Sequence, residues 1–464
     1  MSTAVSKAKE TSFLERKFKL KENGTNVKTE ILAGLNTFLT CVYIVAVNPA
    51  ILSTTGMDVK AVFWATAVSS GFACILMGLL TNFPFALAPA MGLNAYFAFY
   101  VVGVLGLSWQ NALACVAISG ITFTILTFLK VQQKIIDAIP QCIKNAIGPG
   151  IGFFIAFTGL SQAGIIVPSA DTLVQLGDLS NPGVILALIG IAVTAVLVIK
   201  GVKGGMLIGI LLVTILGLFV KDPTTGLPYT QWPTGGIIAF ENPITALAPT
   251  FGQLSLKGMF DGPAVAILGV LFAIFSFLFV DLFDSIGVLL GVCTKAGFVN
   301  EKGEVQGAGK ALFVSAFGAF VGAILGTNTV TIYGAESTTG IAEGGRTGLT
   351  AVTVGILFFA SLILSPLFLM IPSIATASAL VMVGVFMLEP LKDIELGDLS
   401  SAFPAFLTAA IMPFTSSIDR GILFGILGYT LATVAAGKKK EITKTIWILT
   451  VVLFVYLILE ILIK

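Results

Sequence analysis

Residues 82–97 read NFPFALAPAMGLNAYF, and residues 328–345 read NTVTIYGAESTTGIAEGG. Each stretch begins at the Asn of a Thr-Asn pair that follows a long apolar run. Both are poor membrane helices, because two prolines interrupt the first and polar, β-branched and Gly residues weaken the second. Irregular backbone within a membrane is tolerated only where it lines a cavity, so the paired stretches predict a central polar site. The alternative is that they are ordinary loops of a Gly-rich chain.

The composition is that of a membrane protein. Of the 464 residues, 56% are hydrophobic and 11% are charged, whereas soluble proteins carry about 25% charged residues. Apolar runs of about 20 residues recur from Ile31 almost to the C-terminus, which predicts an all-α polytopic membrane protein surrounded by the lipid bilayer.

The residue types that the chain lacks exclude several kinds of chemistry. It has no histidine, which rules out Ser-His-Asp triads, His-ligated metals and His proton relays. Its five cysteines are scattered singly, without a CxxC pair, and are predicted to be small buried hydrophobes rather than metal ligands. It has neither a phosphate-binding Gly-rich loop nor a basic patch interleaved with aromatic residues, so we expect no nucleotide hydrolysis and no nucleic-acid partner.

The apolar runs divide the chain into two halves. A polar, Lys-rich stretch, 1–29, is predicted to be a cytoplasmic N-terminal tail. Residues 30–220 and 262–464 hold seven predicted spans each, and a polar spacer, 221–261, separates them. The predicted spans are 30–52, 61–81, 88–105, 110–129, 146–166, 183–200 and 204–220, followed by 262–293, 307–326, 328–345, 348–366, 372–390, 400–437 and 446–463. Because seven is odd, the second half is expected to be an inverted repeat of the first.

The stretch 400–437 is too long for one straight span, and the sequence around Pro413 interrupts it. Counted as one broken helix, it keeps seven spans in the second half but puts Lys438–Lys440 outside, against the positive-inside rule. Counted as a hairpin, it brings these lysines inside but adds a fifteenth crossing.

Three acidic residues lie where the chain is otherwise apolar. Asp281 and Asp284 are three apart in AIFSFLFVDLFDSIGVLLGV, residues 273–292, and share one helix face, while Glu336 lies within the second broken stretch. A charge at mid-bilayer costs about 2.5–3.5 kcal/mol, and no Lys or Arg lies in these spans. The carboxylates could bind a proton, or a substrate that presents N–H donors; alternatively, they cap broken helices. Glu343 and Arg346 are predicted to form an interfacial pair.

The remaining candidate residues surround the breaks. In the first stretch, Asn94 offers an amide, and the run ending in Met91-Gly92 is suited to the start of a half-helix with unpaired N–H donors. In the second stretch, Ser337 and Thr338 follow Glu336. Aromatic side chains near the breaks are candidates to stack on a flat heteroaromatic ring; they are Phe277, Phe283, Phe97 and Tyr333.

Four motifs in order carry a resemblance to a known family. They are KENGTNVKTEILAGLNTFLTCVYIVAVNPAIL, APAMGLNAYF, FVDLFDSIG and TNTVTIYGAESTTGIAEGGRTGLT. Together they resemble the purine permeases of the nucleobase–cation symporter-2 superfamily, in its adenine/guanine/hypoxanthine (AzgA-like) branch. The resemblance extends from about residue 17 to the C-terminus. VDLFDS without histidine differs from the uracil and xanthine branches, so it disfavours those substrates.

The resemblance implies 14 transmembrane segments in two inverted repeats of seven, with a core domain, a gate domain, and third and tenth spans that each join a short strand to a half-helix. It implies import of adenine, guanine or hypoxanthine by proton symport across the cytoplasmic membrane, in proteins that often form homodimers. Asp281 or Asp284, Glu336 and Asn94 would contact the base. We expect an elevator-type carrier and no enzyme, with protons in place of a cofactor. The rivals are an anion carrier on the same fold, disfavoured by the buried acids, and an intramembrane aspartyl protease, whose motifs are absent.

Overall fold

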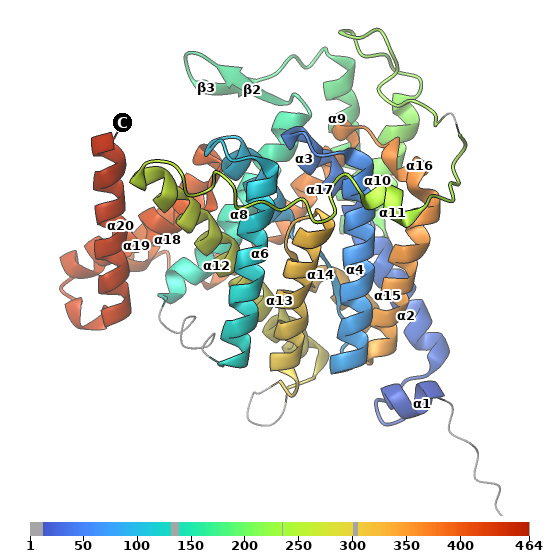
Figure 1. Ribbon diagram of the computed structural model, residues 1–464, viewed down its shortest axis with the longest axis horizontal. Coiled ribbons are helices and arrows are strands. Elements are labelled where there is room, and N and C mark those ends of the chain that lie inside the picture. The colour runs from blue at the N-terminus through green and yellow to red at the C-terminus, as the bar shows by residue number, and fades with distance from the viewer. Residues whose placement is uncertain (1–12, 131–138, 234, 300–304, 464) are drawn as a thin grey trace, which may run out of the picture.

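The computed structural model describes residues 13–130, 139–233, 235–299 and 305–463 (Figure 1). Ten of the described helices are long and apolar enough to cross a membrane, and four shorter apolar helices accompany them. The chain is therefore a multi-pass helical membrane protein, as its composition predicts. The first twelve residues of the predicted tail lie outside the described residues.

The first half contains α1 (Phe13–Phe18), α2 (Val27–Cys41), α3 (Ile44–Leu52), α4 (Val59–Thr81), β1 (Ala86–Pro89), α5 (Met91–Ala95), the π-helix η2 (Tyr96–Val102), α6 (Trp109–Phe128), α8 (Gln141–Gln162), β2 (Ile166–Ser169), β3 (Leu173–Leu176), α9 (Pro182–Ile199) and α10 (Gly205–Gly217). The spacer contains α11 (Pro243–Leu247). The second half contains α12 (Ala264–Ala296), α13 (Ala308–Leu325), β4 (Val330–Tyr333), α14 (Gly334–Ala342), α15 (Gly348–Ser361), α16 (Ser365–Leu369), α17 (Ser373–Phe386), α18 (Leu399–Thr415), α19 (Ile418–Ala435) and α20 (Lys444–Ile463). Side-chain caps fix many of the starts, as Asp58 does for α4 and Ser108 for α6.

The two broken stretches meet in the middle of the molecule. β1 pairs antiparallel with β4, with Ala86 opposite Tyr333 and Pro89 opposite Val330. Each strand leads directly into a short helix, β1 into α5 and β4 into α14. The strands satisfy each other's backbone groups, which an apolar environment requires. The prediction of a short strand joined to a half-helix is therefore confirmed for both stretches.

The helices pack as two groups. In the first, α2, α3, α4, α6, α12, α13, α14 and α15 surround the crossing strands. In the second, α8, α9, α10, α17, α18 and α19 pack mainly on one another. Contacts between the groups are fewer, and α5 on α8 and α12 on α19 are among them. The strand crossing thus lies in one group, close to its boundary with the other.

Residues 400–437 form a helical hairpin. A turn at Ser416 (φ +51°) reverses the chain between α18 and α19, and a Cβ added at Gly421 would collide with Met412 of the opposite helix. The far ends meet again, where the ammonium of Lys438 lies 3.0 Å from the carboxylate of Asp398.

The hairpin decides between the two readings of this stretch. It returns Lys438 to the end of the molecule where Asp398 lies and where the side chain of Asn145 bonds the carbonyl of Asp393. α20 follows the hairpin, so residues 400–463 hold three helices, α18, α19 and α20, where the sequence predicts two spans.

The spacer runs over the ends of the first helix group between α10 and α12 (Figure 1). Glu241 pairs with Lys60 at 2.8 Å and accepts the indole N–H of Trp64 at 3.1 Å. Further along, the side-chain amide of Asn111 bonds the carbonyls of Ser255 and Lys257. The spacer is therefore fastened to the N-terminal ends of α4 and α6.

Candidate functional site

Asp281 and Asp284 of α12 face the strand crossing, surrounded by hydroxyl groups. Asp281 is 1% exposed and accepts a hydrogen bond from the hydroxyl of Ser285 at 3.2 Å. The Ser285 oxygen lies 2.8 Å from that of Ser315 on α13 and 3.0 Å from that of Thr331 on β4. Thr331 also reaches Asp284 at a long 3.5 Å. Ser285 of α12 and Thr331 of β4 thus supply neutral donors to the two carboxylates, and Ser315 of α13 joins the cluster through Ser285.

Glu336 stands in the first turn of α14, where the helix dipole favours a negative charge. It is 8% exposed, and its Oε1 accepts a hydrogen bond of 3.0 Å from the hydroxyl of Tyr43. Tyr43 lies at the break between α2 and α3 and is itself buried. Glu336 follows β4, whose Thr331 reaches Asp284, and α14 packs against α12. The structure therefore brings together the acids of the eighth and tenth predicted spans.

One face of α12 leads from this cluster to the end of the helix. Asp284 is half-buried, and Gly287, Gly291 and Thr294 are exposed; their spacing of three and four residues places them on one helix face. A Cβ added at either glycine would have no neighbour within 4 Å. Open space thus continues along the helix from Asp284, which gives the carboxylate an approach path.

Asn94 is buried beside the crossing. Its amide oxygen accepts a hydrogen bond of 2.9 Å from the side-chain amide of Asn328, and its amide nitrogen makes only a weak contact of 3.9 Å with the sulfur of Met91. Gly92 does not face open space, because a Cβ there would collide with Ile151 of α8. Its small size allows α5 to pack closely on α8.

Three predicted site residues use their hydroxyl groups in hydrogen bonds to other groups of the protein; they are Ser337, Thr338 and Tyr333. Ser337 donates to the carbonyl of Tyr333 and accepts the N–H of Ala86, which ties β1 to α14. Thr338 bonds the carbonyl of Ala335 at 2.6 Å. Tyr333 donates to the carbonyl of Pro89 at 2.6 Å, across the strand pair. Ser337 and Tyr333 therefore hold the crossing together, whereas Thr338 bonds within α14, and none of the three hydroxyls has a spare donor.

The aromatic candidates separate into two kinds. Phe277 and Phe97 are fully buried, and Phe277 packs edge-on against Tyr96 at 5.2 Å and against Phe97 at 6.5 Å. Phe283 is only half-buried and adjoins Asp284 on α12. Phe283 is thus the partly exposed ring of these three and packs on Phe279 at 4.4 Å, while Phe277 and Phe97 belong to the packed interior.

Sequence reasoning missed several buried polar residues. Asn48 of α3 bonds the hydroxyls of Thr66 and Thr327 at 2.6 and 2.7 Å. The fully buried Glu30, at the edge of the predicted tail, accepts the backbone N–H of Arg346 and the hydroxyl of Thr350. The Asn-Pro pair within an apolar run is the one feature of the sequence that could have marked Asn48 as a buried polar residue. Glu30 lies in the first turn of a helix, where acidic residues are common, so the sequence does not mark it.

The predicted pair of Glu343 with Arg346 is wrong. Glu343 pairs instead with Lys203, next to the start of α10. The guanidinium of Arg346 donates to the carbonyls of Ile341 and Gly345 and so closes the C-terminal end of α14. Unpaired carbonyls at a helix end are favourable partners for a cation, which explains why Arg346 binds them and does not pair with Glu343.

Comparison with known proteins agrees with this architecture. The family model Xan_ur_permease, described as a permease family, matches residues 28–424. The adenine permease AdeP of Escherichia coli is 41% identical, with 95% of each chain covered. The guanine/hypoxanthine permease PbuG of Bacillus subtilis is also 41% identical, over 95% of this chain and 98% of its own.

Two solved structures show the same fold at low identity. The transmembrane domain of the cyanobacterial bicarbonate transporter BicA is 15% identical, with a TM-score of 0.60 over 88% of this chain and 97% of its own. The murine anion transporter Slc26a9 in its inward-facing state is 11% identical, with a TM-score of 0.60 over 94% of this chain and 74% of that one. The family match and the full-length relatives identify the chain as a member of the nucleobase–cation symporter-2 permease family, a transporter and not an enzyme.

Proposed function

We propose that the protein imports purine nucleobases, with adenine, guanine and hypoxanthine as the candidate substrates. The observation that carries the proposal is the pair of Asp284 and Glu336 at the strand crossing, whose hydrogen-bond partners among the described residues are hydroxyls rather than cations. A purine ring presents N–H donors, which such carboxylates accept strongly. Relatives at 41% identity are named for adenine and for guanine and hypoxanthine.

The site supports a division of roles. Asp284 and Glu336 accept N–H groups of the base, and the weakly engaged amide nitrogen of Asn94 donates to a ring acceptor. Phe283 stacks on the ring from its position beside Asp284. The N-terminal ends of α5 and α14 add backbone donors on both sides of the crossing.

We assign the coupling of transport to protons to carboxylates, because the chain has no histidine. Binding of a proton by Asp281, Asp284 or Glu336 would neutralise the loaded site and lower the cost of moving it through a low-dielectric barrier. Asp281, which is buried and bonded to Ser285, is suited to hold a proton without touching the base. We therefore propose proton symport without any cofactor.

Movement is proposed to follow the boundary between the helix groups. The group with the strand crossing serves as the core domain and the group with α8 and α17–α19 as the gate domain, in an elevator-type exchange of the site between the two membrane faces. The two repeats of seven segments would end with α10 and α19, which leaves α20 outside them. We also propose that the protein is inserted in the cytoplasmic membrane as a homodimer.

Uptake in a bacterial strain deficient in purine uptake tests the function. Expression of the full chain should restore accumulation of labelled adenine or hypoxanthine, and excess unlabelled purine should compete. A proton uncoupler should abolish accumulation but not counterflow exchange. Failure of every purine to be taken up would overturn the proposal.

A panel of competitors separates the alternatives. Inhibition by uracil or xanthine, with none by adenine, guanine or hypoxanthine, would place the substrate in another branch of the family. Inhibition by bicarbonate or sulfate alone would favour an anion carrier on the same fold. The double variant Asp284→Asn, Glu336→Gln should be inactive. Full transport activity of that variant would contradict the proposed site.

A further inference from the structure

A fourth buried carboxylate lies outside the proposed substrate site. Asp419 is the second residue of α19, directly after the turn of the α18–α19 hairpin, and is 6% exposed. Ser417, which caps α19 through the N–H of Arg420, also donates its hydroxyl to Asp419. The turn therefore fixes Asp419 and Arg420 at the tip of the hairpin, within the apolar part of the protein.

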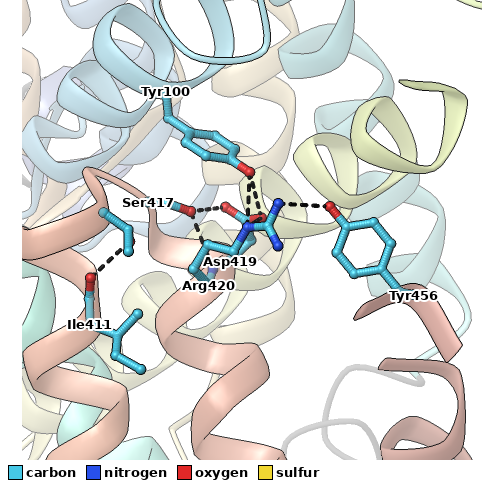
Figure 2. A network of polar contacts seen from close by, with 7 residues as sticks. Tyr100, Ile411, Ser417, Asp419, Arg420 and Tyr456 are labelled. Carbon is cyan, nitrogen blue, oxygen red and sulfur yellow. Dashed lines mark hydrogen bonds and ion pairs between the residues drawn. The ribbon is translucent and has the colours of Figure 1, made fainter. Parts of the chain in front are cut away.

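Tyr100 joins the two charged residues (Figure 2). Its hydroxyl donates to the Oδ2 atom of Asp419 at 3.2 Å and accepts the Nε–H of Arg420 at 3.3 Å. The direct contact between Asp419 and Arg420 is longer, at 4.0 Å. Arg420 also donates to the hydroxyl of Tyr456 on α20 at 3.0 Å and lies over its ring. The hydroxyl of Tyr100 is thus the group that contacts both Asp419 and Arg420.

Tyr100 stands at the far end of the helix that carries Asn94. α5 continues without interruption into η2, and Asn94 precedes Tyr100 by six residues. Tyr96, one turn earlier, stacks on Tyr100 at 5.2 Å. The winding of η2 is π-helical, and π-helical turns are frequently found at functional sites. One helix therefore touches the strand crossing at its start and the hairpin tip at its end.

The cluster bridges the two helix groups. η2 belongs with the crossing strands, and α19 belongs with α8, α17 and α18. We propose that Asp419, Arg420 and Tyr100 form a latch between the hairpin tip and the α5–η2 helix, and that this latch opens when the binding site moves across the membrane. The inference rests on the proposed transport function and adds to it the residues that couple the two groups.

A cavity lies beside the latch. It has a volume of about 290 Å³ and lies between α12, α19 and α20, and Asp419 and Ser276 are on its wall. The hydroxyl of Ser276 has no hydrogen-bond partner among the described residues. The rest of the wall is apolar. The hydroxyl of Ser276 is therefore the polar group on this wall that can take over a hydrogen bond to Asp419 when the latch opens.

Tyr100→Phe is the sharpest test, because it removes one hydroxyl and leaves the charges of Asp419 and Arg420 in place. In proteoliposomes of the purified full chain, we expect the Vmax of adenine counterflow to rise at least about fivefold, since an opening step that breaks a charge-assisted bond becomes easier. Protection of the protein against heat by adenine should stay within about twofold of the wild type. An unchanged or lower Vmax, or a parallel loss of binding, would overturn the latch.

Tyr429→Phe is the control, because it removes a tyrosine hydroxyl from α19, the helix that carries Asp419 and Arg420, away from the cluster. It should leave both counterflow and heat protection unchanged. An effect as large as that of Tyr100→Phe would assign the rise to general loosening of α19 and contradict the proposal.

Hydrogen exchange tests the latch without any substrate. In Tyr100→Phe, the backbone amides of η2 and of the start of α19 should both exchange faster, because the bond links them. Acceleration confined to one of the two segments would reject a link between them. Failure of the wild type to be protected by adenine, guanine or hypoxanthine would instead count against the proposed function, while the exchange result would still decide the latch.

Discussion

Two buried clusters of carboxylates differ in their partners. Around the strand crossing, Asp281 and Glu336 accept hydrogen bonds from the hydroxyls of Ser285 and Tyr43. At the hairpin tip, Asp419 has the guanidinium of Arg420 in the same cluster. A neutral donor leaves a buried charge uncompensated, whereas a guanidinium supplies the opposite charge at once. The first cluster is therefore open to a proton or a substrate, and the second is suited to hold two elements together.

Glu336→Gln should give the largest effect on transport. The amide keeps the shape of the side chain but replaces the charged acceptor by a neutral one. Since hydrogen bonds to charged groups contribute about 1.5–3 kcal/mol, the KM for the purine should rise roughly 10- to 100-fold. Uptake of labelled hypoxanthine over a range of concentrations measures it.

Glu343→Gln is the control for this change. Glu343 follows the last residue of the same helix, α14, and pairs with Lys203 nearer the surface. Uptake by this variant should stay within about twofold of the wild type, because exposed ion pairs contribute little. A loss comparable to that of Glu336→Gln would mean that charge anywhere on α14 matters, and the distinction between the sites would fail.

The architecture around the first cluster could be predicted because it follows from broken hydrophobic patterns. Prolines and polar residues inside apolar runs mark β1 and β4, and an isolated acid in such a run marks Asp281, Asp284 and Glu336. Each of these signals is local, so a single sequence carries it. The same logic could have extended to Asp419, which follows the break at Pro413 by six residues.

The partners could not be predicted, because they come from elsewhere in the chain. Tyr43 reaches Glu336 from the first predicted span, and Tyr100 reaches Asp419 from the third. Neither tyrosine differs in its local pattern from other aromatic residues of apolar helices. For the same reason Phe277 was expected beside the substrate and instead packs against Tyr96. Which face of a helix meets which neighbour is decided by tertiary packing.

Tyr43→Phe should have a smaller effect than Glu336→Gln. It leaves the acceptor in place and removes only the donor that orients Oε1 of Glu336. We expect the KM to rise about three- to tenfold, because one hydrogen bond to a charged group is lost while the ligand can still pair with the carboxylate. Vmax and expression should change little.

The base preference gives a second readout for Tyr43→Phe. If the tyrosine orients the carboxylate, the ratio of adenine to hypoxanthine uptake should change, because the two bases present different donors. A rise in KM that is equal for every base would argue against orientation. A fall in folded protein without any change in KM would assign Tyr43 to packing alone.

The smallest effect is expected at the exposed end of the hairpin, where Asp398 and Lys438 form a surface counterpart of the Asp419–Arg420 pair. The hydroxyl and backbone N–H of Ser400, and then Lys438, lower the pKa of Asp398 from 3.8 to about 2. A carboxyl with a lowered pKa contributes stability above its ordinary pKa of about 4 and loses it as the pH falls towards about 2. Ser400→Ala should therefore weaken the acid dependence of the thermal midpoint in this range more than Lys438→Gln does. High salt should reduce only the part due to Lys438, because it screens an exposed ion pair; the reverse order of the two variants would show that the lysine, and not the helix cap, holds the hairpin end.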